Sequence, residues 1–74
     1  MGRPVKRSLT LKGHRTSVSL EDEFWREFLD IARRKNKAIN VLAAEIDLER
    51  GIDMGLASAI RLYVLSDLKN RLTP

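Results

Sequence analysis

Positive charge gathers near the start of this sequence. Residues 1–20 contain five basic residues and no acidic ones, whereas residues 21–74 contain nine basic and ten acidic residues, and the whole chain has a formal net charge of +4. The basic residues of the first segment are Arg3, Lys6, Arg7, Lys12 and Arg15. A basic segment on a nearly neutral body suits phosphate backbones or anionic membrane surfaces better than a small substrate. The alternative is a solvated leader that binds nothing.

The chain offers few side chains for catalysis. It has no cysteine and one histidine, His14, which excludes disulfides, thiol catalysis and cysteine-based zinc sites. Glu45, Asp47 and Glu49 occupy alternate positions of an expected helix, so Asp47 does not share a face with either glutamate. Because no nucleophile, base and orienting residue are discernible together, we expect no enzymatic activity, no metal, no cofactor and no small-molecule substrate.

The basic residue Arg15 belongs to a segment with a period of two, which predicts a strand over residues 14–20. Thr16, Val18 and Leu20 would lie on one face, and Arg15, Ser17 and Ser19 on the other. A similar short block, SLTL at residues 8–11, precedes Gly13, so the segment is one strand or two strand-like pieces bent at that glycine. We treat residues 1–7 as a flexible basic arm. A lone strand has no partner for its backbone groups, which predicts antiparallel pairing with the same strand of a second chain.

The rest of the sequence has the apolar period of amphipathic helices. The spacing predicts helices over residues 21–35, 39–50 and 54–71, with Asn36 and Gly51 ending the first two. The expected fold class is therefore mostly α with one N-terminal β-strand, and residues 8–74 form a single domain.

A chain of 74 residues seldom builds a core worth more than about 3 to 5 kcal/mol. Without disulfides or a metal, a second subunit is the remaining source of stability. We therefore expect the apolar residues of the strand and the helices to form the core of a homodimer. These residues are Val18, Leu20, Phe24, Phe28, Ile31, Leu42 and Ile46. No uncharged run approaches the roughly 18 to 20 residues that span a bilayer, and we expect a cytoplasmic protein without a membrane partner.

Residues 15–25 (RTSVSLEDEFW) followed by residues 38–42 (AINVL) resemble the ribbon-helix-helix family of DNA-binding proteins, the Arc/MetJ type. Residues 13–21 (GHRTSVSLE) with Phe24 and Trp25 are similar to a bacterial subfamily of small stand-alone proteins. That pattern continues at residues 46–47, 50–51 and 58–61, and the resemblance covers about residues 8–66. It implies that two chains pair their strands into one ribbon that enters the major groove of DNA.

The resemblance also implies roles for individual residues. The base-reading positions of the family fall on Arg15, Ser17 and Ser19, and a guanidinium can bond guanine O6 and N7 together. Ser19 also fits a capping pattern for the first helix, so base reading and capping both stay open.

Phosphate binding in the family uses backbone amides at the start of the second helix, which belong here to Ala38, Ile39 and Asn40. The family usually has Gly and Ser where this chain has Asn36 and Ala38, so a hydroxyl is missing and Lys37 would compensate with charge. Lys12 and Arg7 would contact phosphates without specificity.

The function that this pattern favours is sequence-specific binding of double-stranded DNA by a homodimer, as a transcriptional repressor or autoregulator, with higher oligomers on DNA left open. One alternative is an antitoxin, whose C-terminal segment would capture a toxin. Another is an adaptor that keeps the fold without binding DNA.

Overall fold

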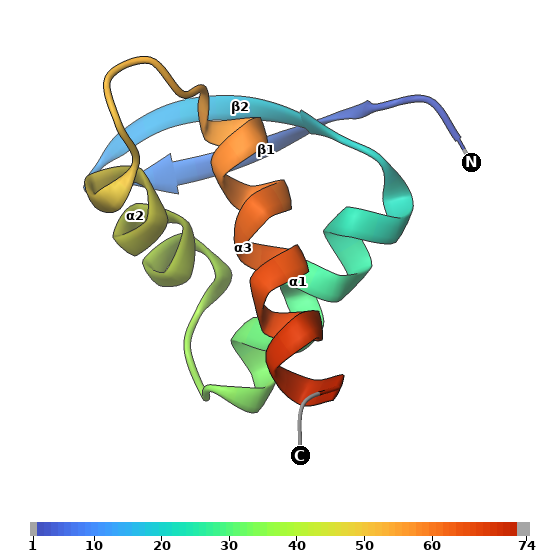
Figure 1. Cartoon of the computed structure of the whole chain (residues 1–74). Coiled ribbons are helices and arrows are strands. Elements are labelled where there is room, and N and C mark those ends of the chain that lie inside the picture. Colours follow the sequence, from blue (N-terminus) through green and yellow to red (C-terminus); the bar gives the residue numbers. More distant parts are fainter. Residues whose placement is uncertain (1, 73–74) are drawn as a thin grey trace.

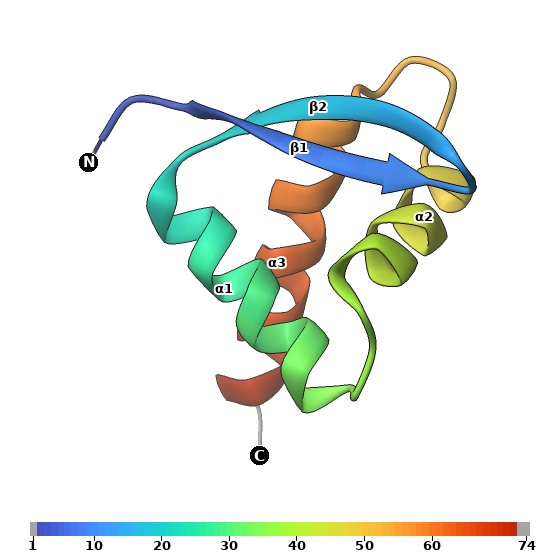
Figure 2. The same cartoon turned by 180° about the vertical axis from the view of Figure 1, so that it is seen from behind.

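The computed structural model describes residues 2–72 of the chain. Two strands, β1 (Val5–Leu11) and β2 (His14–Leu20), are followed by three helices, α1 (Asp22–Arg34), α2 (Ile39–Glu49) and α3 (Leu56–Leu72). The strands form a two-stranded ribbon that lies across one side of the helices (Figure 1). From behind, α1 lies below the end of the ribbon near the N-terminus and α2 below its turn (Figure 2). The mostly helical fold class is confirmed.

The partner of the predicted strand lies in the same chain, which corrects the expectation of a single strand paired with a second subunit. β1 and β2 are antiparallel, with Ser8 opposite Ser17. Lys12 and Gly13 connect them, and both have positive φ, 51° and 83°. Two such residues are typical of the type I′ turn, whose twist matches that of a hairpin. The expected arm is wrong for Val5, Lys6 and Arg7, which belong to β1; Met1 lies outside the described residues.

The helices begin and end within two residues of the predicted positions. Asn36 ends α1 as predicted, with a φ of 57°. The N–H of Lys37 bonds the carbonyl of Ala32 at 2.9 Å and that of Asn36 bonds the carbonyl of Arg33 at 3.0 Å. These two bonds form a Schellman motif, which satisfies carbonyls at the end of a helix. The turn after it directs the chain back toward the ribbon, where α2 begins.

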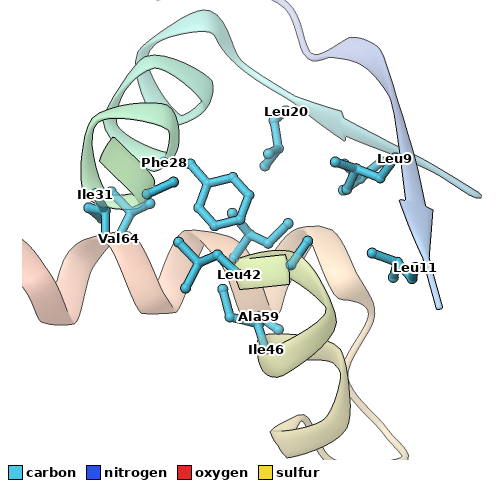
Figure 3. Close-up of a cluster of buried hydrophobic side chains, with 13 residues drawn as sticks. Leu9, Leu11, Leu20, Phe28, Ile31, Leu42, Ile46, Ala59 and Val64 are labelled. Atoms are coloured by element: carbon cyan, nitrogen blue, oxygen red, sulfur yellow. The ribbon is translucent and has the colours of Figure 1, made fainter. Parts of the chain in front are cut away.

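The inward face of the ribbon and all three helices share one hydrophobic core (Figure 3). Among the described residues, Leu20, Phe28, Ile31, Ala43 and Ile60 are fully buried. The predicted dimer core residues are core residues of the single chain, buried in six cases and partly buried in the case of Phe24. The argument that they find too little partner surface within one chain is therefore wrong, because β1 adds Leu9 and Leu11, and α3 adds Ala59, Ile60 and Val64.

No helix within residues 2–72 is long and apolar enough to span a bilayer.

Candidate nucleic-acid interface

The outward face of the ribbon carries hydrogen-bonding side chains from both strands. Arg15, Ser17 and Ser19 are exposed on β2, while Val18 and Leu20 between them are buried. The predicted separation of two faces is therefore confirmed for these residues, but Thr16, expected on the apolar face, is exposed. The placement of Arg15, Ser17 and Ser19 on one open surface leaves their side chains accessible to a ligand.

Sequence reasoning missed the contribution of β1 to this surface. Lys6, Ser8 and Thr10 are exposed and lie opposite Ser19, Ser17 and Arg15, respectively. The signal that could have found them is the alternation of residues 6–11 (KRSLTL), which matches that of residues 15–20 (RTSVSL). We call the exposed side chains on this side of the hairpin the outer ribbon face. Its members are Lys6, Ser8, Thr10, Arg15, Ser17 and Ser19, with two basic groups and no acidic one.

Arg7 does not lie on the outer ribbon face, which corrects its expected role as a phosphate contact. Its guanidinium lies 5.4 Å from the ring centroid of Trp25 and bonds the carboxylate of Asp22. Only 17% of its side chain is exposed. The hydrogen bond and the charge of Arg7 hold the pKa of Asp22 below its ordinary value. Arg7 faces inward because it lies one position from Lys6 on a strand, and it fastens the ribbon to α1.

Ser19 does not cap α1, so the capping alternative is wrong. The N-cap residue is Glu21, without a side-chain capping bond. The Ser19 carbonyl instead accepts a hydrogen bond from Arg61 Nη2 at 3.3 Å, and the same guanidinium pairs with Glu21 at 3.0 Å. The pKa of Glu21 is lowered by a hydrogen bond from the backbone of Glu21 itself and by the bond from Arg61. Arg61 thus fastens β2 to α3 and leaves the Ser19 side chain exposed.

The start of α2 lies against the edge of β1. Asn40 Oδ1 accepts a hydrogen bond from the N–H of Thr10 at 3.0 Å. The N-cap residue, Ala38, provides no side-chain capping bond, as the missing hydroxyl predicts. The first amides of a helix have no partner within it, so those of Ala38, Ile39 and Asn40 are grouped beside the ribbon. The carboxamide oxygen of Asn40 is engaged, and its NH₂ group is the part left to bind a ligand.

Lys37 is not a free charge at this helix start. Its Nζ lies 2.7 Å and 2.9 Å from the two carboxylate oxygens of Glu45. The hydrogen bond to Glu45 raises the pKa of Lys37 above its ordinary value. The compensation expected from Lys37 is therefore offset by a neighbouring carboxylate. Lys12, in contrast, is exposed at the turn of the hairpin.

Grooves flank the turn of the ribbon. One, with a volume of about 430 Å³, is lined by Lys12, His14 and Arg15 on the hairpin and by Asp47 and Arg50 below it. Asp47 and Arg50 pair with each other at 2.6 Å. Within residues 2–72, no group of three or more His, Cys, Asp or Glu side chains is placed to hold a metal ion.

Comparison with known proteins agrees with this geometry. A family model for the ribbon-helix-helix domain matches residues 4–68. The match begins before β1, so both strands of the hairpin fall inside it. No curated protein and no solved structure matches the chain significantly.

Proposed function

Because the chain belongs to the ribbon-helix-helix family, we propose that it binds double-stranded DNA in a sequence-specific manner and acts as a transcriptional repressor or autoregulator. The observation that carries this proposal is the outer ribbon face, where six exposed hydrogen-bonding side chains include two basic residues and no acidic residue. A two-stranded ribbon is one of the shapes that enter a major groove about 12 Å wide. The fold presents this ribbon with its polar side away from the core.

Each part of the surface has a defined chemistry toward DNA. Arg15 bonds O6 and N7 of a guanine together, which discriminates among bases. The hydroxyls of Ser17 and Ser19 bond several base edges and discriminate weakly. The backbone amides at the start of α2 and the ammonium of Lys12 bind phosphates, which positions the ribbon without reading sequence.

We also propose that two copies act together on DNA, in the cytoplasm, as is usual for this family. Each copy has the same complete core, so association adds contacts on DNA instead of completing the fold. No cofactor or small-molecule substrate is needed for this activity.

The experiment is a selection of bound sequences from random duplexes, followed by affinity measurements at two salt concentrations on the selected and scrambled duplexes. Arg15→Ala is the informative variant. Its matched control is Arg33→Ala, which removes the same charge from the last turn of α1, far from the ribbon (Figure 1).

Arg15→Ala should lose affinity for the selected duplex by about 1 to 3 kcal/mol at one base position, while Arg33→Ala keeps its affinity. Equal losses of Arg15→Ala on both duplexes would reduce Arg15 to a phosphate contact. If no duplex is bound above background, the adaptor function replaces DNA binding.

The antitoxin function is a second candidate, because α3 presents leucines to solvent. Leu62, Leu65, Leu68 and Leu72 are each at least 41% exposed, and their spacing places them within one side of the helix. This face supports a protein partner at α3. The test is whether the chain relieves growth arrest caused by expression of a neighbouring gene, and whether Leu65→Glu abolishes that relief while DNA affinity is kept.

A further inference from the structure

The groove of about 430 Å³ beside the turn of the ribbon has a partly apolar lining. It lies where α2 passes below the turn (Figure 2), and we call it the turn groove. Leu11 in its lining belongs to the hydrophobic core, Ala44 and Leu56 pack against that core, and Leu48 is 66% exposed. Its volume falls within the range of about 300 to 1,000 Å³ that holds small ligands. The turn groove therefore offers an apolar surface to the body of a small molecule.

The basic side chains of the turn groove have no partner within the described chain. Lys12, His14 and Arg15 form no side-chain hydrogen bond or ion pair among residues 2–72. An ammonium has three donors, and a guanidinium bonds both oxygens of a carboxylate at once. An imidazole nitrogen can add a further hydrogen bond. These groups are therefore available to an anion.

The acidic side chain among the described residues that line the turn groove is already paired. Asp47 bonds Arg50 at 2.6 Å, and the same guanidinium donates a hydrogen bond to the carbonyl of Met54 at 2.7 Å. These two bonds hold this wall of the groove in place. Because Arg50 offsets Asp47, the surplus positive charge of the groove comes from Lys12 and Arg15.

A neighbouring groove lacks this combination of groups. It has a volume of about 380 Å³ and shares Lys12 and Leu48 with the turn groove. Its lining also contains Val41 and Glu45, and the carboxylate of Glu45 is paired with Lys37. One basic and one acidic residue thus line this second groove, without an arginine. Charge complementarity therefore favours an anion in the turn groove and not in its neighbour.

We propose that the turn groove binds a small organic acid, with its apolar body along the leucines and its carboxylate at Lys12 and Arg15, and that the bound acid weakens DNA binding. Arg15 also belongs to the outer ribbon face, and a guanidinium bonded to a carboxylate is not available to a guanine. By linkage, DNA should lower the affinity for the acid by the same factor. The regulatory part of this inference rests on the proposed DNA binding, whereas the site itself does not.

The first experiment measures binding to the whole chain without DNA. The probes are octanoate, acetate, which has the charge without the apolar body, and octanamide, which has the body without the charge. Each is titrated at the same ionic strength and followed through the backbone amide resonances.

Octanoate should bind saturably, with a dissociation constant on the order of 1 mM, and should shift the amides of the hairpin turn and of the end of α2 most strongly. Acetate and octanamide should each bind at least about tenfold more weakly, because each lacks one of the two kinds of contact. Equal binding of octanoate and acetate would overturn the proposal, and so would octanoate shifts centred away from the turn groove.

Matched variants on α2 assign the binding to this groove. Leu48→Gln removes an apolar side chain from the turn groove without adding a charge, and it should weaken octanoate binding by about 3- to 10-fold. Val41→Gln is the control, because Val41 is also exposed on α2 but lines the neighbouring groove alone of the two. Thermal melting checks the fold of both variants. A loss of octanoate binding in Val41→Gln but not in Leu48→Gln would place the ligand in the other groove and overturn the assignment.

The second experiment adds the selected duplex. Octanoate at ten times its dissociation constant should weaken DNA binding by the wild type about tenfold, relative to the same concentration of acetate. The same concentration should have a smaller effect on Leu48→Gln, which binds less octanoate. An unchanged DNA affinity of the octanoate-bound wild type would overturn the proposed regulation. If the wild type binds no duplex even without an added acid, the proposed function itself fails, while the first experiment still decides whether the site exists.

Discussion

At the scale of single residues, position on a strand decides which basic groups remain available. Lys6 and Arg7 are neighbours, yet Lys6 lies on the outer ribbon face and Arg7 is bonded to Asp22 and packed on Trp25. The charge excess near the start of the sequence therefore overstates the charge available to a polyanion. Lys37 is similarly offset by Glu45.

Replacing Glu45 with glutamine should strengthen DNA binding, because it removes the carboxylate that competes with phosphate for Lys37. The gain should appear on selected and scrambled duplexes alike. It should also steepen the salt dependence by up to about 0.9 per phosphate neutralised. Glu49→Gln is the control, since Glu49 is the last residue of α2 and Lys37 lies just before its first residue. An identical effect of both substitutions would point to a general charge effect.

Asp22 should make stability depend on pH below the neutral range. Its pKa is lowered in the folded chain from an ordinary value of 3.8 by the bond from Arg7. A carboxyl with a lowered pKa stabilises the fold above its unfolded pKa, and that contribution is lost as the pH falls through the folded value. Urea unfolding measured from pH 7 down to about pH 2 should show this loss setting in below the ordinary pKa of 3.8, and Asp22→Asn should flatten the profile. An unchanged profile would contradict a folded-state bond to Arg7.

At the scale of elements, the hairpin is the least predictable part of the fold and the helices are the most predictable. The apolar period of each helix is long enough to locate it from its own residues. The alternation of β1 is short and starts among basic residues, which favoured an arm. β1 is recognised as the partner of β2 only when the structure shows that its Leu9 and Leu11 belong to the core.

Leu9 provides a direct test of β1. It is 2% exposed, and Leu9→Ala should lower the free energy of unfolding by about 2 to 5 kcal/mol. Thr10→Ala, at the adjacent exposed position, should change it by less than about 0.5 kcal/mol. Chemical denaturation of the two variants makes the comparison. Equal stabilities would mean that residues 5–11 are an unpaired arm.

A substitution in the turn of the hairpin should raise stability and lower DNA affinity. Lys12 has a positive φ of 51°, where asparagine followed by glycine is the favoured pair. Lys12→Asn should therefore raise the melting temperature, and it should lower affinity for all duplexes because one exposed charge is lost. A variant that is less stable than the wild type would contradict the type I′ turn.

At the scale of the whole molecule, ion pairs between residues far apart in the sequence join elements whose contacts the sequence pattern does not predict. Arg34 bonds Asp67 at 2.7 Å, and Arg61 reaches Glu21 at 3.0 Å. Each pair joins α3 to the first half of the chain. No local pattern identifies such partners among the many charged residues. The outer positions of β2 could therefore be predicted from its alternation, whereas the ion pairs that hold the ribbon against the helices could not.

A core completed within one chain changes the expected folding behaviour. Thermal unfolding in the absence of DNA should have a midpoint that does not vary with protein concentration, because folding does not consume a second chain. Calorimetry over a hundredfold concentration range makes the measurement. A midpoint that rises with concentration would restore a folding-linked dimer.

The two side chains that bond the ribbon edges also bear on aggregation. A short exposed sheet is a template on which other strands can add, which leads to edge-to-edge polymers. Asn40 occupies the N–H of Thr10 on one edge and Arg61 contacts the carbonyl of Ser19 on the other. Each edge is therefore interrupted by a side chain from a helix, which hinders strand addition and helps keep the protein from polymerising while its ribbon stays uncovered.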